Sequence, residues 1–221
     1  MCVCVLLSMR SLDFNVWSSS SILRYSHLEV NESDLYGLNS SKSLRSEVFG
    51  KTSQGGLCTV CNKSWTGCPG HWGHIRLASP VYHVGWMSYV LYWCRLTCNG
   101  CGRVQEKRGK RCMYCDVVMV HVVKSDAYAL TMNKRPLEAK DVLEWFEKIP
   151  AEDVYDVTGY NTFHPKDLIL TILPVPPNQV RPSPMLNDSE IHGEDDITRR
   201  LLLIVRVNKS LQRYNGTLTR Y

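Results

Sequence analysis

The chain has 221 residues, which is enough for one ordinary domain or two small ones. Its 44% apolar and 21% charged residues are typical of a soluble globular protein, and no apolar run approaches the roughly 18 residues of a membrane span, so a transmembrane protein is excluded. The net charge of +5, with an isoelectric point near 8.7, permits an anionic partner without requiring one.

Residues 1–20 are expected to form a flexible N-terminal lead-in. Cys2 and Cys4 stand at C-x-C spacing but are interpreted as unligated thiols, and the run Ser18 to Ser21 is polar. The apolar run that follows Met1 has no basic residue before it and no clean cleavage site after it, so it does not indicate a secretory signal.

The next stretches predict helix, loop and extended chain in turn. Ile22 to Tyr36 predicts a short helix, and Leu38 to Gly56, which is rich in Ser, Gly, Lys and Asn, predicts a surface loop. Ile75 to Val84 is extended in character, because Pro80 blocks a regular helix. Gly85 to Cys94 places apolar residues at helical spacing and predicts an amphipathic helix.

This amphipathic helix is rich in aromatic side chains. They could form a surface that stacks nucleic-acid bases, but most such stripes belong to a core, and the core is the favoured interpretation. The residues are Trp86, Tyr89, Tyr92 and Trp93.

The second half of the chain predicts a hairpin and then a helix. Val117 to Val123 and Ala127 to Met132 are β-branched or alternating runs, and Lys124-Ser125-Asp126 between them is a polar turn. A helix over about Leu137 to Ile149 follows, opened and ended by prolines.

The last third predicts a helical turn, a strand, a strut and a long helix. Ala151 to Thr158 is the helical turn, ended by Gly159, and Leu168 to Leu173 is the strand. Pro174 to Pro184 is a rigid, extended strut that cannot join a central sheet strand. Gly193 to Arg213 is the longest predicted helix, with acidic residues at its N-terminal end, as the helix dipole prefers.

Cysteine spacing is the most specific signal in the sequence. Eight of the ten cysteines fall between Cys58 and Cys115, mostly in C-x-x-C pairs. Such a turn directs two sulfurs at one tetrahedral metal ion, which suits zinc better than a disulfide framework. The sequence therefore predicts two bound Zn²⁺ ions and a reducing, intracellular compartment.

The first cluster, CTVCNKSWTGCPGHWGH, offers three thiols and two imidazoles for the four positions of a closed zinc site. A tight turn at Pro69-Gly70 could bring the nearer histidine to the metal, so His74 is only the substitute ligand. The predicted ligands are Cys58, Cys61, Cys68 and His71.

The second cluster is a C-x2-C pair, a ten-residue spacer and another C-x2-C pair. Chance clustering at these spacings is improbable, so the alternative of eight buried structural thiols carries little weight. Because each set is complete without water or substrate, both sites are predicted to be structural rather than catalytic. The ligands of the second site are Cys98, Cys101, Cys112 and Cys115.

The spacer of the second cluster is basic. Its cations could contact a nucleic-acid backbone, or they could offset the charge of about −2 on a four-thiolate zinc site or solvate a loop, and the sequence favours neither interpretation. The residues are Arg103, Lys107, Arg108, Lys110 and Arg111.

Other catalytic chemistry is absent from the sequence, which has no glycine-rich phosphate loop and no G-x-S-x-G motif. Asp195-Asp196 at a helix start is interpreted as a complement to the helix dipole rather than a magnesium pair. Cys94, between the clusters, is interpreted as a buried apolar thiol.

A series of phrases carries a family resemblance: CTVC, CPGHWGHIRLASPVYHVGW, CNGC, CMYC, EWFEKIPAEDV, LTILPVPPNQVRPS and GEDDITRRL. In this order they resemble the N-terminal clamp region of the largest subunit of multisubunit DNA-directed RNA polymerases. The resemblance runs from about Ser20 to Arg213. The short spacer before Cys112 and the phrases EKIPAEDV and LIVRVNKSL look more archaeal than eukaryotic nuclear.

The resemblance implies an α+β fold: an irregular, zinc-stabilised clamp head with helices, a small antiparallel hairpin and no large regular sheet. It places the first ligand set in the clamp head and the second nearer the clamp base, where the zinc ions stiffen a jaw that closes over template DNA and the RNA hybrid. Pro174 to Ser183 resembles the chain that leads toward the cleft, with Arg181 able to approach nucleic acid.

The resemblance also implies boundaries and partners. The clamp region spans 21–213, with both zinc sites in 58–115, between the lead-in at 1–20 and a divergent tail at 214–221. The implied partners are the other polymerase subunits, including the second-largest, template DNA, the RNA hybrid and transcription factors, and no membrane. The implied location is the cytoplasmic nucleoid for an archaeal protein and the nucleus for a eukaryotic one.

The chain departs from the family pattern where catalysis is concerned. The NADFDGD loop, which holds the catalytic Mg²⁺ in this family, does not occur in the sequence, so Mg²⁺ belongs only to the complete polymerase and the chain alone is expected to be inactive. SKSLRS at Ser41 to Ser46 replaces the family's D-P-R-L-G phrase. A truncated or split gene product explains the missing loop and the divergent ends. The competing hypotheses are a free-standing zinc-binding nucleic-acid module or transcription regulator, and a nonfunctional remnant.

Overall fold

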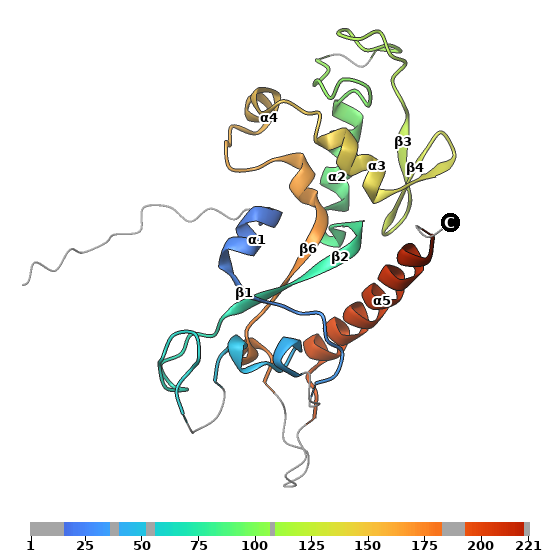
Figure 1. Cartoon of the computed structure of the whole chain (residues 1–221). Coiled ribbons are helices and arrows are strands. Elements are labelled where there is room, and N and C mark those ends of the chain that lie inside the picture. The colour runs from blue at the N-terminus through green and yellow to red at the C-terminus, as the bar shows by residue number, and fades with distance from the viewer. Residues whose placement is uncertain (1–15, 36–39, 52–55, 107–108, 183–192, 219–221) are drawn as a thin grey trace, which may run out of the picture.

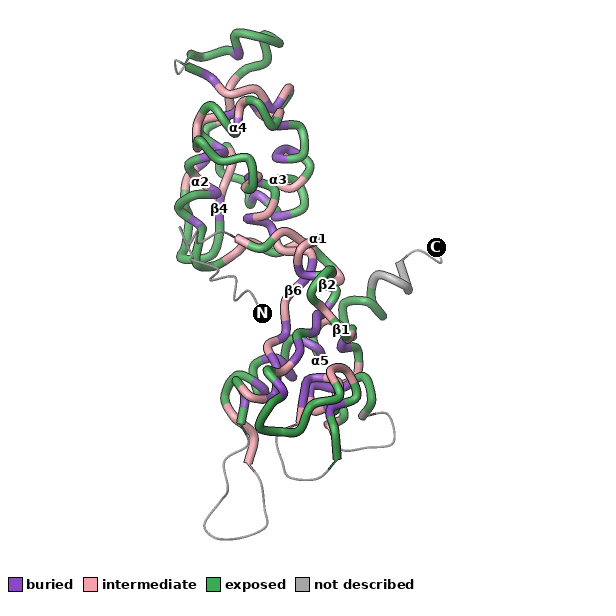
Figure 2. Tube along the Cα trace, turned by 90° about the vertical axis from the view of Figure 1, so that its left-hand side faces the viewer, coloured by how far each residue is buried: buried purple, intermediate pink, exposed green. Residues whose placement is uncertain are grey.

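The computed structural model describes residues 16–35, 40–51, 56–106, 109–182 and 193–218. These residues form two lobes at opposite ends of a long pair of strands (Figure 1), and buried residues gather in both lobes (Figure 2). Within this described part the fold is α+β, with two three-stranded sheets and no large sheet, as the sequence predicts. The expectations for Cys2 and Cys4 lie outside the described residues.

The spine of the molecule is a sheet of three strands in the order β1 (Ser26–Glu29), β2 (Trp72–Tyr82) and β6 (Ile169–Val175). β2 and β6 are antiparallel and pair from Gly73 with Val175 at the lower end to Tyr82 with Ile169 at the upper end. β1 joins the lower end of β2 in parallel. Pro174 is tolerated because β6 is an edge strand, so the stretch joins no central strand, as expected. The extended strut predicted over Pro174 to Pro184 is corrected, because Pro174 and Val175 belong to β6 and a 3-10 helix follows over Asn178–Val180.

The upper lobe packs helices and a small antiparallel sheet around one apolar core. Helical spacing turns Trp93, Phe146 and Val154 into this core, where each is at least 99% buried. α4 ends at Gly159, whose φ of 72° makes a left-handed C-cap, as its predicted end requires. The elements are η3 (Val84–Trp86), α2 (Met87–Leu96), β3 (Val122–Asp126), β4 (Ala129–Met132), β5 (Arg135–Leu137), α3 (Ala139–Phe146), α4 (Ala151–Thr158) and η4 (Pro165–Leu168).

The lower lobe packs the longest helix and several short 3-10 helices against the lower end of the spine. Leu201, Leu202 and Val205 of the long helix lie in this second core. None of the helices that the structure describes is both long and apolar enough to cross a membrane. The elements of this lobe are η1 (Ser40–Lys42), η2 (Glu47–Phe49), η5 (Asn178–Val180) and α5 (Asp196–Leu218), whereas α1 (Ser19–Tyr25) lies beside β2 and β6 of the spine (Figure 1).

Two predictions for the N-terminal part are wrong. The helix expected over Ile22 to Tyr36 ends at Tyr25, because the chain then pairs with β2 as β1, and tertiary pairing overrides local propensity. The surface loop expected over Leu38 to Gly56 is not a surface segment in its described part, since Leu44 and Phe49 are fully buried in the lower core.

The predicted hairpin is present, but its first strand is displaced, since only Val122 and Val123 of the predicted run Val117 to Val123 lie in β3. Lys124 to Asp126 continue β3, and the chain reverses at residues 127–128. Pro136 does not open a helix but lies in the edge strand β5, where its missing N–H costs no ladder hydrogen bond. The predicted helix therefore begins two residues late, at Ala139.

The aromatic stripe on α2 is core at one position only. Trp93 is 1% exposed, but Trp86, Tyr89 and Tyr92 are between 38% and 53% exposed. The preference for a core stripe is thus corrected for three of the four aromatic residues.

Candidate metal centres

Three turns of the same backbone shape hold six of the eight predicted ligands. In each C-x-x-C turn, the N–H of the first cysteine donates to the carbonyl five residues later, at 2.8 to 3.0 Å, and the N–H four residues later donates back to that cysteine, at 2.9 to 3.1 Å. The turns begin at Cys58, Cys98 and Cys112. Repetition of one hydrogen-bond pattern shows that these segments are ordered knuckles rather than irregular loops.

A left-handed residue closes each knuckle. Asn62, Gly102 and Asp116 have φ values of 54°, 76° and 56°. Asn, Asp and Gly are the residues that enter this region most readily, so the sequence suits the shape at all three places. An Asn, Gly or Asp four residues after the first cysteine of each pair is a further sequence signal for this turn, beyond the spacing of the cysteines.

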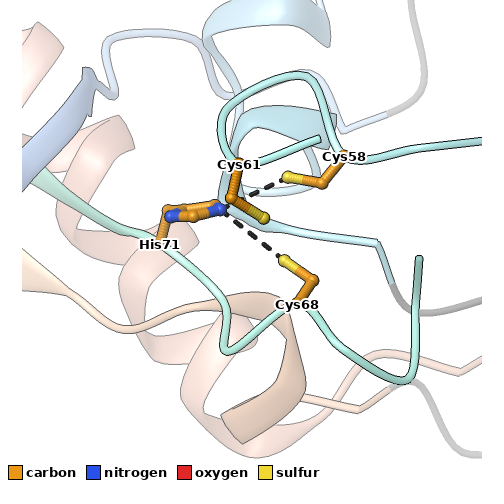
Figure 3. Close-up of side chains that lie close together, drawn as sticks. All are labelled: Cys58, Cys61, Cys68 and His71. Atoms are coloured by element: carbon orange, nitrogen blue, oxygen red, sulfur yellow. Dashed lines mark hydrogen bonds between the residues drawn. The ribbon is translucent and has the colours of Figure 1, made fainter. Parts of the chain in front are cut away.

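The first ligand set is brought together by one knuckle, one loop cysteine and the residue before β2 (Figure 3). The Nε2 atom of His71 lies 3.3 Å from the sulfur of Cys58 and 3.6 Å from that of Cys68. The four ligand atoms all lie within 4.8 Å of one another. They belong to Cys58, Cys61, Cys68 and His71, the predicted set.

These separations fit a tetrahedral zinc ion. Zn–S bonds of about 2.3 Å and Zn–N bonds of about 2.0 Å give edges of about 3.8 Å between sulfurs and about 3.5 Å between sulfur and nitrogen. Cys58, Cys68 and His71 are each less than 9% exposed, so three ligands are already out of water. Burial lowers the pKa of His71, and the nearby His27 lowers it further, which favours the neutral imidazole that a metal requires.

Core contacts fix the position of the histidine ligand. The N–H of His71 donates to the carbonyl of Phe49 at 3.1 Å, and Phe49 is fully buried. Gly70 before it has a φ of 80°, and a side chain there would collide with Pro177 and Gln179. The tight turn expected at Pro69-Gly70 therefore depends on glycine both for its backbone conformation and for the close approach of the η5 segment.

His74, the substitute ligand of the sequence prediction, is not in the set. Its Nδ1 atom lies 2.7 Å from the hydroxyl of Ser26, and its Nε2 atom lies 3.7 Å from a carboxylate oxygen of Glu29. Both partners belong to β1, so this imidazole joins β1 to β2.

The second ligand set is made by two knuckles that face each other at the tip of the upper lobe. The sulfurs of Cys98 and Cys115 are 3.6 Å apart, as are those of Cys101 and Cys112, and all four sulfurs lie within 4.8 Å of one another. This also fits the sulfur–sulfur edge of a tetrahedral site. The set is less enclosed than the first, since Cys115 is exposed.

Polar contacts anchor the second set to α4. The carboxylate of Asp153 accepts the N–H of Val104 at 2.9 Å and pairs with Arg103 at 3.1 Å. Gly102 approaches the carbonyl of Lys148 so closely that any side chain would collide with it. Gln105 links the knuckles to each other, because its side-chain oxygen accepts the N–H of Met113 at 3.1 Å.

The thiols differ in how readily they ionise. Burial opposes ionisation of Cys112, but N–H groups of Tyr114 and Cys115 stabilise its thiolate, and its pKa falls to about 6. Burial raises the pKa of Cys94 to about 12. Cys94 is 1% exposed in the upper core, which confirms the prediction of a buried apolar thiol.

The basic spacer is described only in part, because Lys107 and Arg108 lie outside the described residues. Arg103 pairs with Asp153 and lies over the ring of Tyr114, 5.2 Å from its centroid. Arg111 pairs with Asp116 at 3.0 Å, and Lys110 is exposed. Among these described contacts, the two arginines pair with carboxylates rather than with thiolates.

The structure corrects the expectation that Arg181 approaches nucleic acid. Its side chain is fully buried and donates to the carbonyls of Pro176 and Leu44 and to the hydroxyl of Thr198, at 2.9 to 3.0 Å. Its guanidinium also lies 5.1 Å from the ring centroid of Phe49. Arg181 therefore joins the η5 segment, the loop near η2 and α5.

Asp195 completes this anchor at the start of α5. Its carboxylate accepts the N–H of Thr198 at 2.9 Å and lies 3.5 Å from Arg45. Burial opposes its ionisation, but the bonds to Thr198 and the two nearby arginines lower its pKa. This is the N-terminal capping role that the sequence predicts.

A family model described as RNA polymerase Rpb1, domain 1, matches residues 7–130 and 121–220 of the chain. The match includes both ligand sets and both lobes.

Named relatives agree with the family model. The chain is 29% identical to DNA-directed RNA polymerase subunit Rpo1N of Sulfolobus acidocaldarius and 28% identical to that of Thermoplasma acidophilum, over 92% and 94% of this chain. It is 25% identical, over 96% of its length, to DNA-directed RNA polymerase III subunit RPC1 of Plasmodium falciparum. The chain covers only 28% of each archaeal relative and 11% of the Plasmodium protein.

Proposed function

Because the chain belongs to the RNA polymerase Rpb1 domain 1 family and corresponds to the N-terminal region of the largest polymerase subunit, we propose that it acts as a zinc-stiffened clamp within a transcribing polymerase. The proposed clamp region spans 21–213, between the lead-in and the C-terminal tail. The chain contributes to nucleotidyl transfer only through the complete enzyme, which supplies the catalytic Mg²⁺.

The observation that carries this proposal is that each of the two lobes at the ends of the β2–β6 strand pair contains one complete four-residue set that could hold a metal ion. Neither set leaves a position for substrate, so the metal ions act on shape rather than on chemistry. A jaw that closes over nucleic acid must move without bending, and zinc ions that fix the knuckles of both lobes supply that stiffness. The donor sets, Cys3His and Cys4, are those of structural zinc sites.

The proposed partners are the other polymerase subunits, above all the second-largest, together with template DNA and the RNA hybrid. The spacer of the second set is the proposed nucleic-acid contact, through Lys107, Arg108, Lys110 and Arg111. Arg103 forms an ion pair with Asp153 and is therefore a weaker candidate for such a contact. The proposed location is that of the polymerase itself, the nucleoid in an archaeon or the nucleus in a eukaryote.

Metal content is the first test. Elemental analysis of the folded chain should give two equivalents of zinc, as Cys4 and Cys3His sites bind this metal tightly in reducing surroundings. One equivalent or none in soluble, folded protein would contradict the site assignment.

Assembly with the polymerase is the second test. The chain should co-purify with a second-largest polymerase subunit when the two are expressed together. A stable monomer that ignores reconstituted polymerase would overturn the clamp proposal. Salt-dependent binding of the isolated chain to DNA, lost on reversing the charges of Arg108, Lys110 and Arg111, would instead identify a free-standing nucleic-acid module.

A further inference from the structure

The two ligand sets differ in how far water reaches their sulfurs. In the first set, two cysteines are buried, the third is half-buried, and the four ligand side chains point toward one another (Figure 3). In the second set, Cys115 is exposed, and it is the one exposed residue among the eight cysteines that the structure describes. An oxidant dissolved in water therefore reaches the second set first, through Cys115.

The surroundings of Cys115 leave its sulfur uncovered. Gly100 of the facing knuckle stands beside it, and a methyl group built on Gly100 would lie 3.5 Å from the sulfur. The neighbours along the chain shield little, since Met113, Tyr114 and Val117 are between 40% and 69% exposed. The absence of a side chain at Gly100 thus leaves open a path to the sulfur that any other residue would narrow.

A second sulfur lies within reach of Cys115. The sulfur of Cys98, on the other knuckle, is 3.6 Å away. Because a disulfide needs a separation of about 2.05 Å, the two side chains have to close by only about 1.5 Å. The pair is therefore arranged as an exposed thiol that an oxidant attacks and a nearby thiol that resolves the product.

We propose that Cys115 and Cys98 form a site of reversible oxidation by hydroperoxides, at which the second set gives up its zinc while the first set keeps its own. The proposal rests on the zinc assignment made above but not on the clamp role. Ligand thiols of a zinc site are deprotonated, so Cys115 is already in the form that attacks a peroxide.

The oxidation takes two steps and consumes one molecule of hydrogen peroxide. The thiolate of Cys115 attacks one oxygen, the O–O bond breaks, hydroxide leaves, and the sulfur becomes a sulfenic acid. The thiolate of Cys98 then attacks that sulfur, forms the S–S bond and expels a second hydroxide. Two electrons pass from the sulfurs to the peroxide oxygens. Cys101 and Cys112 remain, which is half of the ligand set that a closed site requires, so the metal is released.

The disulfide would preserve the tip after the metal has left. It joins the same two knuckles that the metal joined, and the hydrogen bond from the Met113 N–H to Gln105 at 3.1 Å supports the same connection. A dithiol reductant reverses the change, because it takes the place of the disulfide, returns two electrons to the sulfurs and restores four ligands for zinc.

The test uses the full chain loaded with two equivalents of zinc, hydrogen peroxide in modest excess and a dye that reports free zinc. One equivalent should be released at least about tenfold faster than the other. Alkylation of the remaining thiols and peptide mapping should then show a disulfide between Cys98 and Cys115, with a mass loss of about 2 Da for the two hydrogens removed. A dithiol with added zinc should restore the lost equivalent.

A variant that changes no ligand tests the path to the sulfur. Gly100→Ala places a methyl group beside Cys115, and the exposed Val117, 3.2 Å from that methyl, has room to yield. The fast release should slow about twofold to threefold with hydrogen peroxide, and more with the bulkier tert-butyl hydroperoxide. Gly67→Ala is the matched control next to Cys68 of the first set, where the new methyl has no neighbour closer than 3.7 Å, and it should release zinc as the wild type does.

Other outcomes would overturn the proposal. Release of both equivalents at one rate, or a first disulfide that joins cysteines of the first set, would remove the selectivity. A first disulfide within one knuckle, between Cys112 and Cys115, would take the resolving role from Cys98. Equal rates for Gly100→Ala and the wild type with both peroxides would show that the path does not control the reaction. Fewer than two equivalents of zinc before peroxide is added would instead contradict the metal assignment itself.

Discussion

The two candidate metal centres have similar donor sets, but they are connected differently to the lobes that carry them. In the lower lobe, the ligand His71 immediately precedes β2, and its N–H bonds to Phe49, which is fully buried beside Arg181. In the upper lobe, the four cysteines stand on two knuckles at an exposed tip, held to α4 mainly through Asp153. The first centre is thus bonded directly to a residue of a hydrophobic core, whereas the second is joined to its lobe largely by polar contacts.

The difference indicates that the effect of a metal site on the stability of a fold depends on which other residues its ligand residues contact. Structural zinc contributes about 10 to 16 kcal/mol of apparent binding free energy in small domains, wherever the site lies. How far the loss of that energy spreads depends on what the ligand backbones touch. Here the lower centre leads through Phe49 and Arg181 to the start of α5, and the upper centre leads to α4 through Asp153 and to the end of α2 through the N–H of Gln105, which donates to the carbonyl of Leu96.

The largest expected effect comes from breaking the lower centre. Cys58→Ser should reduce zinc from two equivalents to one and open the lower lobe, because His71 loses the metal that holds the start of β2 against Phe49. Hydrogen exchange should accelerate throughout β1, the lower half of β2 and the start of α5, while α2 and α3 keep their protection.

The proposed difference between the two centres is contradicted if Cys58→Ser loses zinc but hydrogen exchange accelerates only between residues 56 and 71. Such a result would mean that the lower core holds its shape without the metal.

A smaller and more local effect is expected at the upper centre. Cys112→Ser should also leave one zinc equivalent, but exchange should rise only at residues 97–106 and 109–120, because the upper core is formed by other residues. The same mass spectra that report on Cys58→Ser provide the comparison. Loss of protection in α3 to the same extent as in the tip would show that the second centre is as deeply integrated as the first.

The sequence predicted the chemistry of the centres better than the structure around them. Cysteine spacing and the Pro69-Gly70 turn, which are local signals, singled out the eight residues whose side chains the structure brings together in two groups that could hold metal ions. The burial of Phe49 and Arg181 could not be read from the sequence, since each is enclosed by segments far along the chain. A surface-type composition around Leu44 and an arginine in a proline-rich stretch both indicate solvent when they are considered locally.

The elements show the same division between local and distant causes. The helices α2, α4 and α5 were predicted within a few residues, because amphipathic spacing, Gly159 and acidic capping are local features. β1 was mistaken for helix because its parallel partner, β2, lies more than forty residues away. Long-range pairing decides such short segments, and propensity within them is a weak guide.

The anchor of the upper centre can be weakened without touching a ligand. Asp153→Ala removes the acceptor of the Val104 N–H and the partner of Arg103, and it should cost about 1 to 2 kcal/mol, expressed as faster exchange in the first knuckle of this set. Both zinc ions should remain. Asp156→Ala, at an exposed position on the same helix, is the matched control and should change neither the exchange rate in this knuckle nor the zinc content. Equal effects of the two substitutions would show that α4 does not position the knuckle.

The smallest expected effect is a difference between the lobes in their response to pH, carried by His74. Burial lowers the pKa of His74, against the opposing effect of Glu29, so the native state disfavours the protonated ring. The neutral imidazole therefore contributes stability above the ordinary histidine pKa of about 6.5, and this contribution declines as the pH falls through the native pKa. In the upper lobe, burial lowers the pKa of His164 in the same direction.

Substituting each histidine should separate these two contributions. His74→Gln should flatten the fall in β1 and β2 protection between pH 7 and pH 5.5, after correction for intrinsic exchange, and leave η4 unchanged. His164→Gln should do the reverse, because its ring contacts the carbonyl of Ile149 in the upper lobe. An unchanged pH slope in β1 after His74→Gln would mean that the hydroxyl of Ser26 and the carboxylate of Glu29 hold the protonated and neutral rings equally well, and that the acid sensitivity of the lower lobe resides in the metal centre instead.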